Sequence, residues 1–482
     1  MARFPLPVIP GRLIELEVAD EFRRGAPVAR MVRATGEPVE IGPVRHTGKA
    51  GDVREVSDNG VRWLVGVGGG EGTDWRAAGA ALVRAAGAED GLKAIQVELD
   101  GEVRGDNVAD LATGVLLGGY RFKVSASDHG PGLRTIRLLT PFERAVPEYS
   151  QMLERVRELA AAATLARDLA NTPSNIKNPD WLAGVAERLA EGLPGLRATI
   201  RDEEWLAAQG FGGVLAVGGG SASPPRLIEL AYRPRAASGH LLLVGKGITF
   251  DTGGLSIKPA EGMHLMRTDM AGGAAVISAI RAIAALRLGV RVTALVPAAE
   301  NHVSGGSYRP GDVVRHYGGR TTEVSNTDAE GRMVLADALA YGIRRFRPDA
   351  VVDVATLTGA MKVALGLRTG ALFASDDGLA SQVLDAGKQA GELWWRMPLL
   401  DAHADAVRGE LADVRQAPGG PGGITAALFL REFVGDVPWA HLDIAGPARA
   451  ESHYAEVVPG ATGFATRTLV ELAASYSESA ST

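Results

Sequence analysis

In the first 145 residues, segments with a hydrophobic side chain at every second position alternate with segments that have one at every third or fourth position. The first spacing predicts strands and the second predicts helices. The predicted strands are Leu13–Val18, Arg62–Val67, Ile95–Leu99 and Thr135–Leu139, and the predicted helices are Asp74–Ala88 and Asn107–Leu117. Strands that alternate with helices are typical of an α/β domain, which we place at residues 1–145. A glycine cluster at residues 68–72 lacks the GxGxxG frame of a dinucleotide site and is interpreted as a turn.

The remaining chain is predicted to form a larger α/β domain. A long helical pattern at Tyr149–Leu169 predicts a connecting helix over 146–170, and repeated βα units follow over 171–482. The predicted strands are Leu227–Tyr232, Leu241–Val244, Val290–Val296, Val351–Val354, Ala371–Ala374 and Ala440–Ile444. The predicted helices are Trp181–Glu191, Ala271–Leu286, Glu330–Phe346, Leu379–Ala390, Thr425–Phe433 and Ala465–Ser475. Nearly all-apolar strands indicate a mostly parallel central sheet with helices on both faces.

Composition narrows the classes of function. The chain is 46% hydrophobic and 22% charged, as in an ordinary globular protein, and its net charge of -6 argues against nucleic acid or an anionic membrane as partner. The absence of cysteine excludes thiolate metal sites and a cysteine nucleophile. The amino-terminal stretch lacks the apolar core of a signal peptide, so we expect a cytoplasmic protein with no membrane partner.

The loop at residues 326–332, Asn-Thr-Asp-Ala-Glu-Gly-Arg, carries two carboxylates beside an arginine. Extended character precedes it and helical spacing follows from Met333, so it is a strand-to-helix loop. In an open α/β sheet such a loop lies at the carboxyl edge, where ligands bind. Asp328 and Glu330 are expected to face one cleft, with Arg332 in the first helical turn. Helix capping is the alternative interpretation of each carboxylate.

Two further strand-end loops supply charged side chains. Lys246 follows the predicted apolar strand Leu241–Val244, and Asp251 comes five residues after Lys246. Asp269 begins the next predicted helix. A phosphate-loop interpretation of Lys246 fails because His240 and Gly247 occupy positions that the motif reserves for other residues. Carboxylates gathered at one sheet edge repel unless cations lie between them, and oxygen ligands suit Mg, Mn or Zn. The pattern therefore predicts two divalent metal ions, with Lys246 a ligand only as the neutral amine.

Several motifs resemble, in order and spacing, those of the cytosolic leucine aminopeptidase family. They are Lys246 with Asp251, Lys258, and the segments 166–173, 266–270, 326–332, 355–360, 441–446, 460–463 and 467–472. The resemblance is dense from about residue 160 to 475 and thin before that. It implies a smaller, macro-like amino-terminal α/β domain, a larger carboxyl-terminal catalytic domain, and a two-metal aminopeptidase.

The resemblance implies a ligand set for each metal ion. Asp251, Asp328 and Glu330 hold one ion by this analogy, and Lys246, Asp251, Asp269 and Glu330 hold the other. Glu330 bridges the two ions, and the carbonyl of Asp328 is a further ligand.

Two cationic side chains are catalytic by the same resemblance. Lys258 stabilises the oxyanion that develops when a water acidified by the two cations attacks the scissile carbonyl. Arg332 keeps its charge and holds a bicarbonate ion, which serves as general base. The implied cofactors are therefore bicarbonate and two divalent ions, Mn or Zn, with Mg as a third candidate.

The resemblance also implies the substrate and the assembly. A free α-amino group on one metal restricts cleavage to the first residue of a peptide. The substrate-binding residues carried over are Met266, Thr356, Leu357, Gly359 and Ala445. They suggest an apolar pocket for Leu or Met, widened because Ala448 stands where a larger apolar residue is expected. Family members are typically hexamers, so a homohexamer is expected.

Two other functions are weighed against the aminopeptidase. A two-metal phosphoesterase would use the same carboxylates with Lys and Arg around a phosphate. A DNA-binding family member with a vestigial metal site is the other alternative. The intact ligand set and the net charge of -6 weigh against it, and nucleic acid is not an expected partner.

Overall fold

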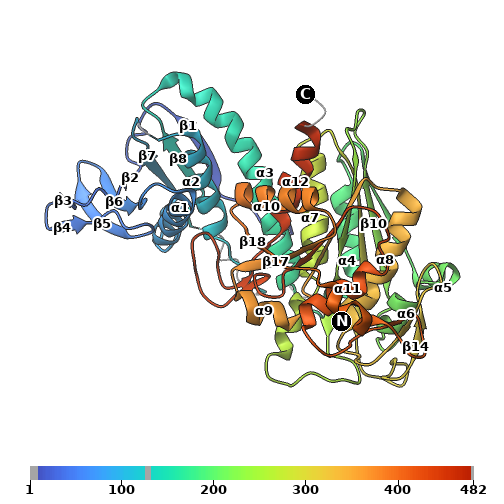
Figure 1. Cartoon of the computed structure of the whole chain (residues 1–482). Coiled ribbons are helices and arrows are strands. Elements are labelled where there is room, and N and C mark those ends of the chain that lie inside the picture. The colour runs from blue at the N-terminus through green and yellow to red at the C-terminus, as the bar shows by residue number, and fades with distance from the viewer. Residues whose placement is uncertain (1–8, 102, 125–131, 479–482) are drawn as a thin grey trace. The chain divides into compact units, whose positions relative to one another are not determined.

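The computed structural model describes residues 9–101, 103–124 and 132–478, which form two compact units (Figure 1). The first unit comprises residues 1–164 with 450–459, and the second comprises 165–449 with 460–482. Helix α3 (Val146–Asn171) carries the chain from the first unit into the second.

The amino-terminal unit is built on a six-stranded sheet of order β1-β8-β7-β2-β6-β5. Its pairs are parallel except β5 with β6. The strands of this sheet are β1 (Glu15–Ala19), β2 (Val28–Val32), β5 (Val53–Asp58), β6 (Val61–Gly66), β7 (Ala94–Glu98) and β8 (Thr135–Leu139), and β3 (Val39–Ile41) and β4 (Val44–His46) form a separate two-stranded sheet. The helices are α1 (Gly72–Gly87), α2 (Gly105–Gly118) and the 3-10 turn η1 (Glu143–Ala145).

Helices α1 and α2 pack closely because two glycines leave room for backbone contact. A Cβ atom on Gly79 would lie 2.2 Å from the carbonyl oxygen of Leu111, and one on Gly114 would lie 2.1 Å from that of Arg76. Residues 450–459 also pack in this unit, although the sequence analysis placed them with the catalytic domain. Arg76 Nε lies 3.7 Å from the Glu456 carboxylate, an ion pair that ties this segment to α1.

The second unit contains a nine-stranded sheet whose main path is β18-β17-β20-β16-β11-β13-β10-β9, with β12 beside β13. Its strands are β9 (Leu196–Arg201), β10 (Arg226–Tyr232), β11 (His240–Gly245), β12 (Gly247–Asp251), β13 (Arg291–Asn301), β16 (Ala350–Ala355), β17 (Thr369–Ala374), β18 (Leu393–Arg396) and β20 (Trp439–Asp443). Five short strands lie outside it: β14 (Val313–Arg315), β15 (Thr321–Glu323), β19 (Val414–Arg415), β21 (Arg449–Ala450) and β22 (Gly460–Ala461). The central strands β20, β16, β11 and β13 are parallel.

Helices cover both faces of this sheet (Figure 1). They are α4 (Pro179–Ala190), α5 (Glu203–Gln209), α6 (Gly212–Gly218), α7 (Ala271–Ala285), α8 (Glu330–Phe346), α9 (Gly359–Leu365), α10 (Asp377–Ala390), α11 (Gly422–Arg431) and α12 (Thr466–Glu478), with 3-10 helices η2 (Met263–Thr268) and η3 (Asp401–Val407). Helix α7 packs with α12, and α8 packs with α6 and α11. Strands β11 and β16 are buried along their whole length, as strands covered on both faces must be.

One helical stretch, Met263–Ala285, is long and apolar enough to cross a membrane by length and composition. In the structure 89% of its apolar window is buried, and a core helix meets the same criteria. Helix α7, which forms most of it, is apolar around its circumference because it packs against the sheet on one side and α12 on another.

The predicted mixed α/β architecture with a parallel-rich central sheet is confirmed. Helix α8 has the predicted bounds, and α7 ends one residue earlier than predicted. The sequence analysis missed β2 to β5, β9, β12 and β18, the short strands β14, β19, β21 and β22, and the helices α5, α6 and α9. Strand β9 lies at a sheet edge and carries two arginines, so it lacks the apolar run that marks a buried strand.

Candidate metal centre

The five candidate metal ligands lie at strand ends, helix starts and the turns between them, and the loop before α8 follows β15 of the three-stranded sheet rather than a strand of the central sheet. Lys246 directly follows β11, and Asp251 is the last residue of β12. Asp269 follows η2, Asp328 lies in the loop before α8, and Glu330 is the first residue of α8. The structure thus brings together side chains from loops spread over 85 positions of the sequence, from 246 to 330.

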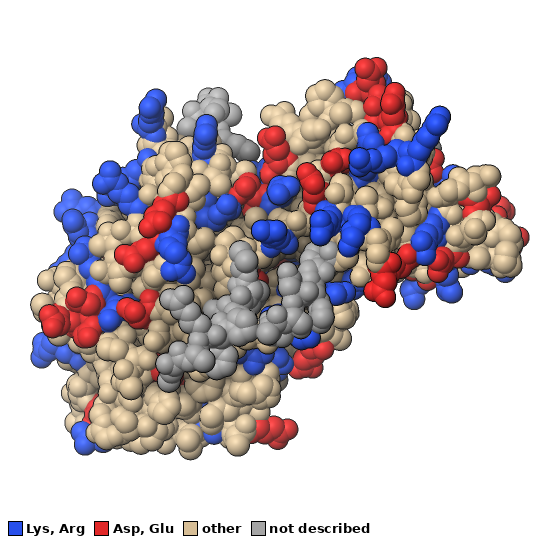
Figure 2. Space-filling model, turned by 180° about the vertical axis from the view of Figure 1, so that it is seen from behind, with Lys and Arg blue, Asp and Glu red and all other residues tan. Residues whose placement is uncertain are grey.

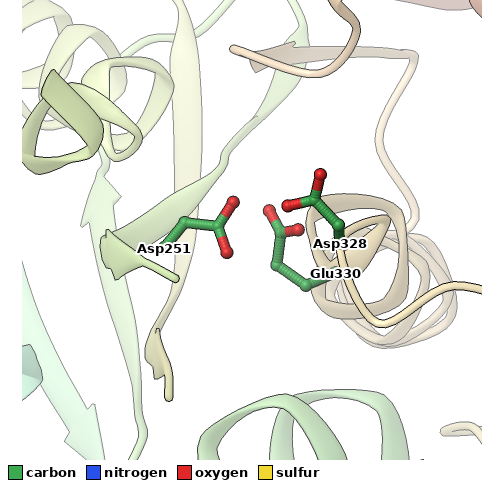
Figure 3. A group of neighbouring side chains, drawn as sticks. All are labelled: Asp251, Asp328 and Glu330. Atoms are coloured by element: carbon green, nitrogen blue, oxygen red, sulfur yellow. The ribbon is translucent and has the colours of Figure 1, made fainter. Parts of the chain in front are cut away.

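Three of the carboxylates point toward one another (Figure 3). Asp251, Asp328 and Glu330 each offer one oxygen atom, and these atoms all lie within 4.8 Å of one another. Asp251 and Glu330 are buried, and Asp328 is half-buried. Burying like charges this close is costly unless positive charge balances them.

The Lys246 ammonium lies among the carboxylates on one side of the site. Its Nζ is 2.8 Å from Asp269 Oδ2 and 2.7 Å from Glu330 Oε1, and it donates to the carbonyl oxygen of Thr356 at 3.0 Å. Burial alone would lower the pKa of Lys246, but the carboxylates of Asp269, Glu330 and Asp251 outweigh burial and raise it. A cation on the same carboxylates acts in the opposite direction and favours the neutral amine.

The Lys258 ammonium occupies the other side of the site. Its Nζ lies 2.8 Å from Asp251 Oδ2 and contacts the Asp328 carboxylate. Burial, with a further contribution from the neighbouring Asp251 carboxylate, raises the pKa of Glu330 to about 7 and that of Asp328 to about 6. The ionised carboxylates therefore need more positive charge than this lysine provides.

The donor set fits two divalent cations. With Asp269 included, four carboxylates face Lys246 and Lys258. When Lys246 is the neutral amine that a metal ligand must be, three negative charges remain, more than one divalent cation neutralises. Within the described residues, Asp269 Oδ2 and Asp328 Oδ1 are buried and accept no hydrogen bond of good geometry, although each touches a lysine. Carboxylate oxygen together with a neutral amine suits Mn or Zn. The residues therefore fit the metal pair that the sequence analysis expects.

Glycine at two positions leaves room for close packing near the site, and one of them, Gly331, contacts Lys246. A Cβ atom on Gly331 would lie 2.6 Å from Lys246 Cε, so only glycine lets the lysine reach Glu330 along the start of α8. A Cβ atom on Gly272 would lie 2.0 Å from the carbonyl oxygen of Val354, where α7 meets the end of β16. The glycine of the 326–332 loop thus has a steric reason that helix capping alone does not provide.

Two further buried side chains, the amide of Asn301 and the phenol of Tyr308, hold Asp251 and the backbone next to Asp328 in place. Asn301 Nδ2 donates to Asp251 Oδ1 at 2.8 Å and to the carbonyl oxygen of Thr327 at 3.0 Å. The hydroxyl of Tyr308 donates to the same carbonyl at 2.7 Å. Sequence reasoning missed both residues, because neither stands beside a motif or at a distinctive spacing.

Gln416 holds the 325–329 loop and was also missed. Its Oε1 accepts from the backbone N–H groups of Ser325 and Asn326, both at 3.1 Å, and its Nε2 donates to the Ala329 carbonyl at 3.0 Å. Its own carbonyl accepts from an Arg332 guanidinium nitrogen at 2.5 Å. The parallel pair β15–β19 brings this glutamine to the loop, and no local pattern in the sequence marks it.

Arg332 is buried beside the carboxylates and stays charged. Burial lowers its pKa to about 10, which still leaves the guanidinium protonated at neutral pH. Among the residues that the structure describes, its Nε has no hydrogen-bond partner. A buried guanidinium N–H without a partner is an available donor for an anion.

The residues predicted to bind substrate lie on four segments around the site. Met266 is in η2, Thr356 and Leu357 follow β16, Gly359 begins α9, and Ala445 follows β20. Thr356 joins its segment to the ligand set, because its hydroxyl donates to Asp269 Oδ1 at 2.7 Å. All five are at least partly exposed, as residues that meet a substrate must be.

Fold and site together define an α/β metallohydrolase, and comparison with known proteins identifies its family. The model of the cytosol aminopeptidase family, catalytic domain, matches residues 164–470. A probable cytosol aminopeptidase of Syntrophotalea carbinolica is 47% identical over 368 residues, 75% of this chain and 74% of that protein. One of Roseiflexus castenholzii is 48% identical over 370 residues, 75% of each chain.

Solved structures agree with the sequence relatives. The bottromycin maturation enzyme BotP in complex with Mn is 41% identical, with a TM-score of 0.84 over 93% of this chain and 99% of that one. A mutant of tomato leucine aminopeptidase is 30% identical, with a TM-score of 0.87 over 98% of both chains. This chain therefore belongs to the cytosol aminopeptidase family and is a metallo-aminopeptidase of the leucyl type.

Proposed function

We propose that this enzyme removes the first residue of peptides, preferring Leu, Met and other apolar residues. Residues 171–482, apart from 450–459, which pack with the amino-terminal unit, are the catalytic domain, residues 146–170 are the connecting helix, and residues 1–145 are a separate domain. The observation that carries the proposal is the buried cluster in which Asp251, Asp328 and Glu330 offer oxygens within 4.8 Å of one another.

Two divalent cations, Mn or Zn with Mg as a third candidate, are the proposed cofactors. Asp251, Asp328 and Glu330 would hold one cation, and Lys246, Asp251, Asp269 and Glu330 would hold the other. When bound, the cations acidify the attacking water and polarise the scissile carbonyl. Support comes from the fit of the donor set and from the relative BotP, whose structure contains Mn.

Lys258 is the proposed donor to the oxyanion. Its ammonium is protonated, because the neighbouring carboxylates outweigh its burial and raise its pKa. It is only partly buried, with about 20% of its side chain exposed, so it can reach both the carboxylates and a substrate oxygen. A preorganised donor of this kind stabilises negative charge as it develops in the transition state.

Arg332 is the proposed site for bicarbonate, which would act as general base and carry the proton to the leaving amine. The unpartnered Nε within the described residues and the retained positive charge support this assignment. The guanidinium presents a planar fork that matches a carboxylate-like anion.

Turnover of the wild-type enzyme is expected to depend on bicarbonate, and removal of the Arg332 guanidinium should abolish this dependence. In the wild-type protein, turnover in bicarbonate-free buffer should rise when bicarbonate is added, by up to ~100-fold, the scale of general-base catalysis. The variant Arg332→Met should turn over slowly with or without bicarbonate, as measured by steady-state kinetics in degassed buffers. An equal response to bicarbonate in both proteins would contradict the assignment.

The substrate preference rests on residues around the site. Met266 and Ala445 supply apolar surface, Thr356 and Gly359 border it, and Leu357 offers a backbone carbonyl to the substrate. The proposed anchor for the free α-amino group is the metal pair, which restricts cleavage to the first residue.

A homohexamer in the cytoplasm completes the proposal. Relatives are named cytosol aminopeptidases, which supports the location. Leu393 and Trp395 support self-association, because both lie on the edge strand β18 with more than 60% of their surface exposed.

The test compares leucine p-nitroanilide with its N-acetylated form, using protein stripped of metal and reloaded with Mn or Zn. Metal-dependent cleavage of the free-amine substrate alone is expected, because the α-amino group must be free to bind. Cleavage of both substrates would contradict an exopeptidase. Cleavage of neither would direct the search to phosphate esters, which the same carboxylates and cations suit.

A further inference from the structure

Asp443, the last residue of β20, is a buried carboxylate that joins two separate segments of chain. Its Oδ1 accepts from the backbone N–H of Leu357 at 3.2 Å and from that of Ala445 at 3.0 Å. Its Oδ2 accepts from the backbone N–H of Thr358 at 3.0 Å and from the Thr358 hydroxyl at 2.7 Å. One side chain thus holds residues 357–358 against residue 445.

These two segments border the metal site. Residue 356, next to the first segment, accepts a hydrogen bond from Lys246 Nζ at its carbonyl and donates one to Asp269 from its hydroxyl. The backbone N–H of Ile444 donates to the Ala355 carbonyl at 2.8 Å, so the segments also meet at the end of β16. Past the end of β16, the hydrogen bonds that the structure describes between residues 357–358 and residue 445 all pass through the Asp443 side chain.

The contacts suit the ionised carboxylate. All four partners are donors, three N–H groups and one hydroxyl, and a carboxylate offers about four lone-pair sites. An asparagine would replace one oxygen with an NH₂ group. In one orientation that group would face the N–H groups of Leu357 and Ala445, and in the other it would face the N–H and hydroxyl of Thr358. In either orientation at least one N–H would lose its acceptor.

We propose that Asp443 is a positioning residue that sets side-chain selectivity by fixing the 357–358 segment relative to Ala445. This inference rests on the proposed function, which gives both segments contacts with the substrate. Asp443 contacts none of the proposed ligands, but its charge raises the pKa of Arg332. Loss of that charge would lower turnover of every substrate alike, whereas a change in the shape of the pocket alters the ratio between substrates.

Asp353 provides a matched control in the neighbouring strand. It is fully buried like Asp443, and it lies on β16, two residues before the position that pairs with Asp443. Its carboxylate accepts from Trp439 Nε1 at 2.7 Å and pairs with His441 Nδ1 at 2.6 Å. These partners are side chains within the sheet, so Asp353 stabilises the fold without touching the pocket segments.

The experiment measures kcat and KM of the Mn-loaded enzyme for leucine and alanine p-nitroanilides. Asp443→Asn should lower the ratio of kcat/KM for leucine to kcat/KM for alanine at least ~10-fold, mainly through a higher KM for the leucine substrate. A change of this size is the scale on which a pocket discriminates between substrates that differ by methylenes. Mn affinity, measured by calorimetry, should stay within about twofold of wild type. Asp353→Asn should lower the melting temperature but keep the ratio.

Three outcomes would overturn the inference. They are an unchanged ratio in Asp443→Asn, an equal loss of selectivity in both variants, and a loss of Mn affinity that accounts for the kinetics. If Asp443→Asn does not fold, Thr358→Val decides, since it removes only the hydroxyl donor; its ratio should fall in the same direction, and an unchanged ratio rejects the inference. Absence of amide cleavage by the wild-type protein would remove the proposed function before any variant is compared.

Discussion

Replacement of Lys258 by alanine is expected to lower turnover at least ~100-fold while metal stays bound, the usual scale for the loss of one oxyanion donor. The lysine is positioned for this role by Asp251 and Asp328, both of which it contacts. The variant removes a donor to the transition state but none of the proposed ligands. Turnover should be measured with leucine p-nitroanilide, and Mn affinity by calorimetry on the same preparation.

A matched lysine separates this effect from a general loss of charge. Lys388 lies in the last turn of α10, is exposed, and has no contact with the site, so Lys388→Ala should keep wild-type turnover. Near-normal turnover in Lys258→Ala would remove Lys258 from the mechanism. Loss of metal in parallel with turnover would show instead that the lysine supports the ligands.

Replacement of Gly331 by alanine is expected to weaken metal binding by at least ~10-fold, the scale for disturbed support of a ligand. The added Cβ would lie 2.6 Å from Lys246 Cε, which is inside van der Waals contact. The lysine is the flexible partner, so its side chain must move and lose its contacts with Asp269 and Glu330. Mn titration followed by calorimetry measures the loss directly.

Gly184 in α4 provides the control for this substitution. A Cβ atom there would have an ordinary contact of 3.7 Å with Arg188, so Gly184→Ala should keep wild-type metal affinity and raise the free energy of unfolding by up to about 1 kcal/mol. A folded Gly331→Ala protein with normal Mn affinity would contradict the proposed place of Lys246 among the ligands.

Elements with a strong local pattern could be predicted from the sequence, and elements that depend on distant partners could not. Helix α8 was predicted with its observed bounds because its apolar positions repeat at helical spacing over 17 residues. Strand β12 was missed because it has only five residues and a single residue, Lys246, separates it from β11, so the segment was taken for the loop after that strand. It forms only because the end of β13 offers a pairing edge.

The candidate site divides in the same way. The carboxylates, Lys246, Lys258 and Arg332 could be listed from motifs, since charged side chains in strand-end loops stand out from an apolar background. Their support could not be listed. Gln416 and Asn301 reach the site through sheet pairing with segments far away in the sequence.

The sequence by itself determined the α/β class, the family and the set of charged side chains that meet at one sheet edge. Those properties follow from local periodicity and from motifs a few residues long. Only the tertiary structure decided that Asp443 joins residues 357–358 to Ala445, that Gly331 leaves space for Lys246, and that Gln416 holds the loop before α8. The physical reason is that hydrogen-bond geometry and steric fit depend on which strands lie side by side, and local spacing does not encode that.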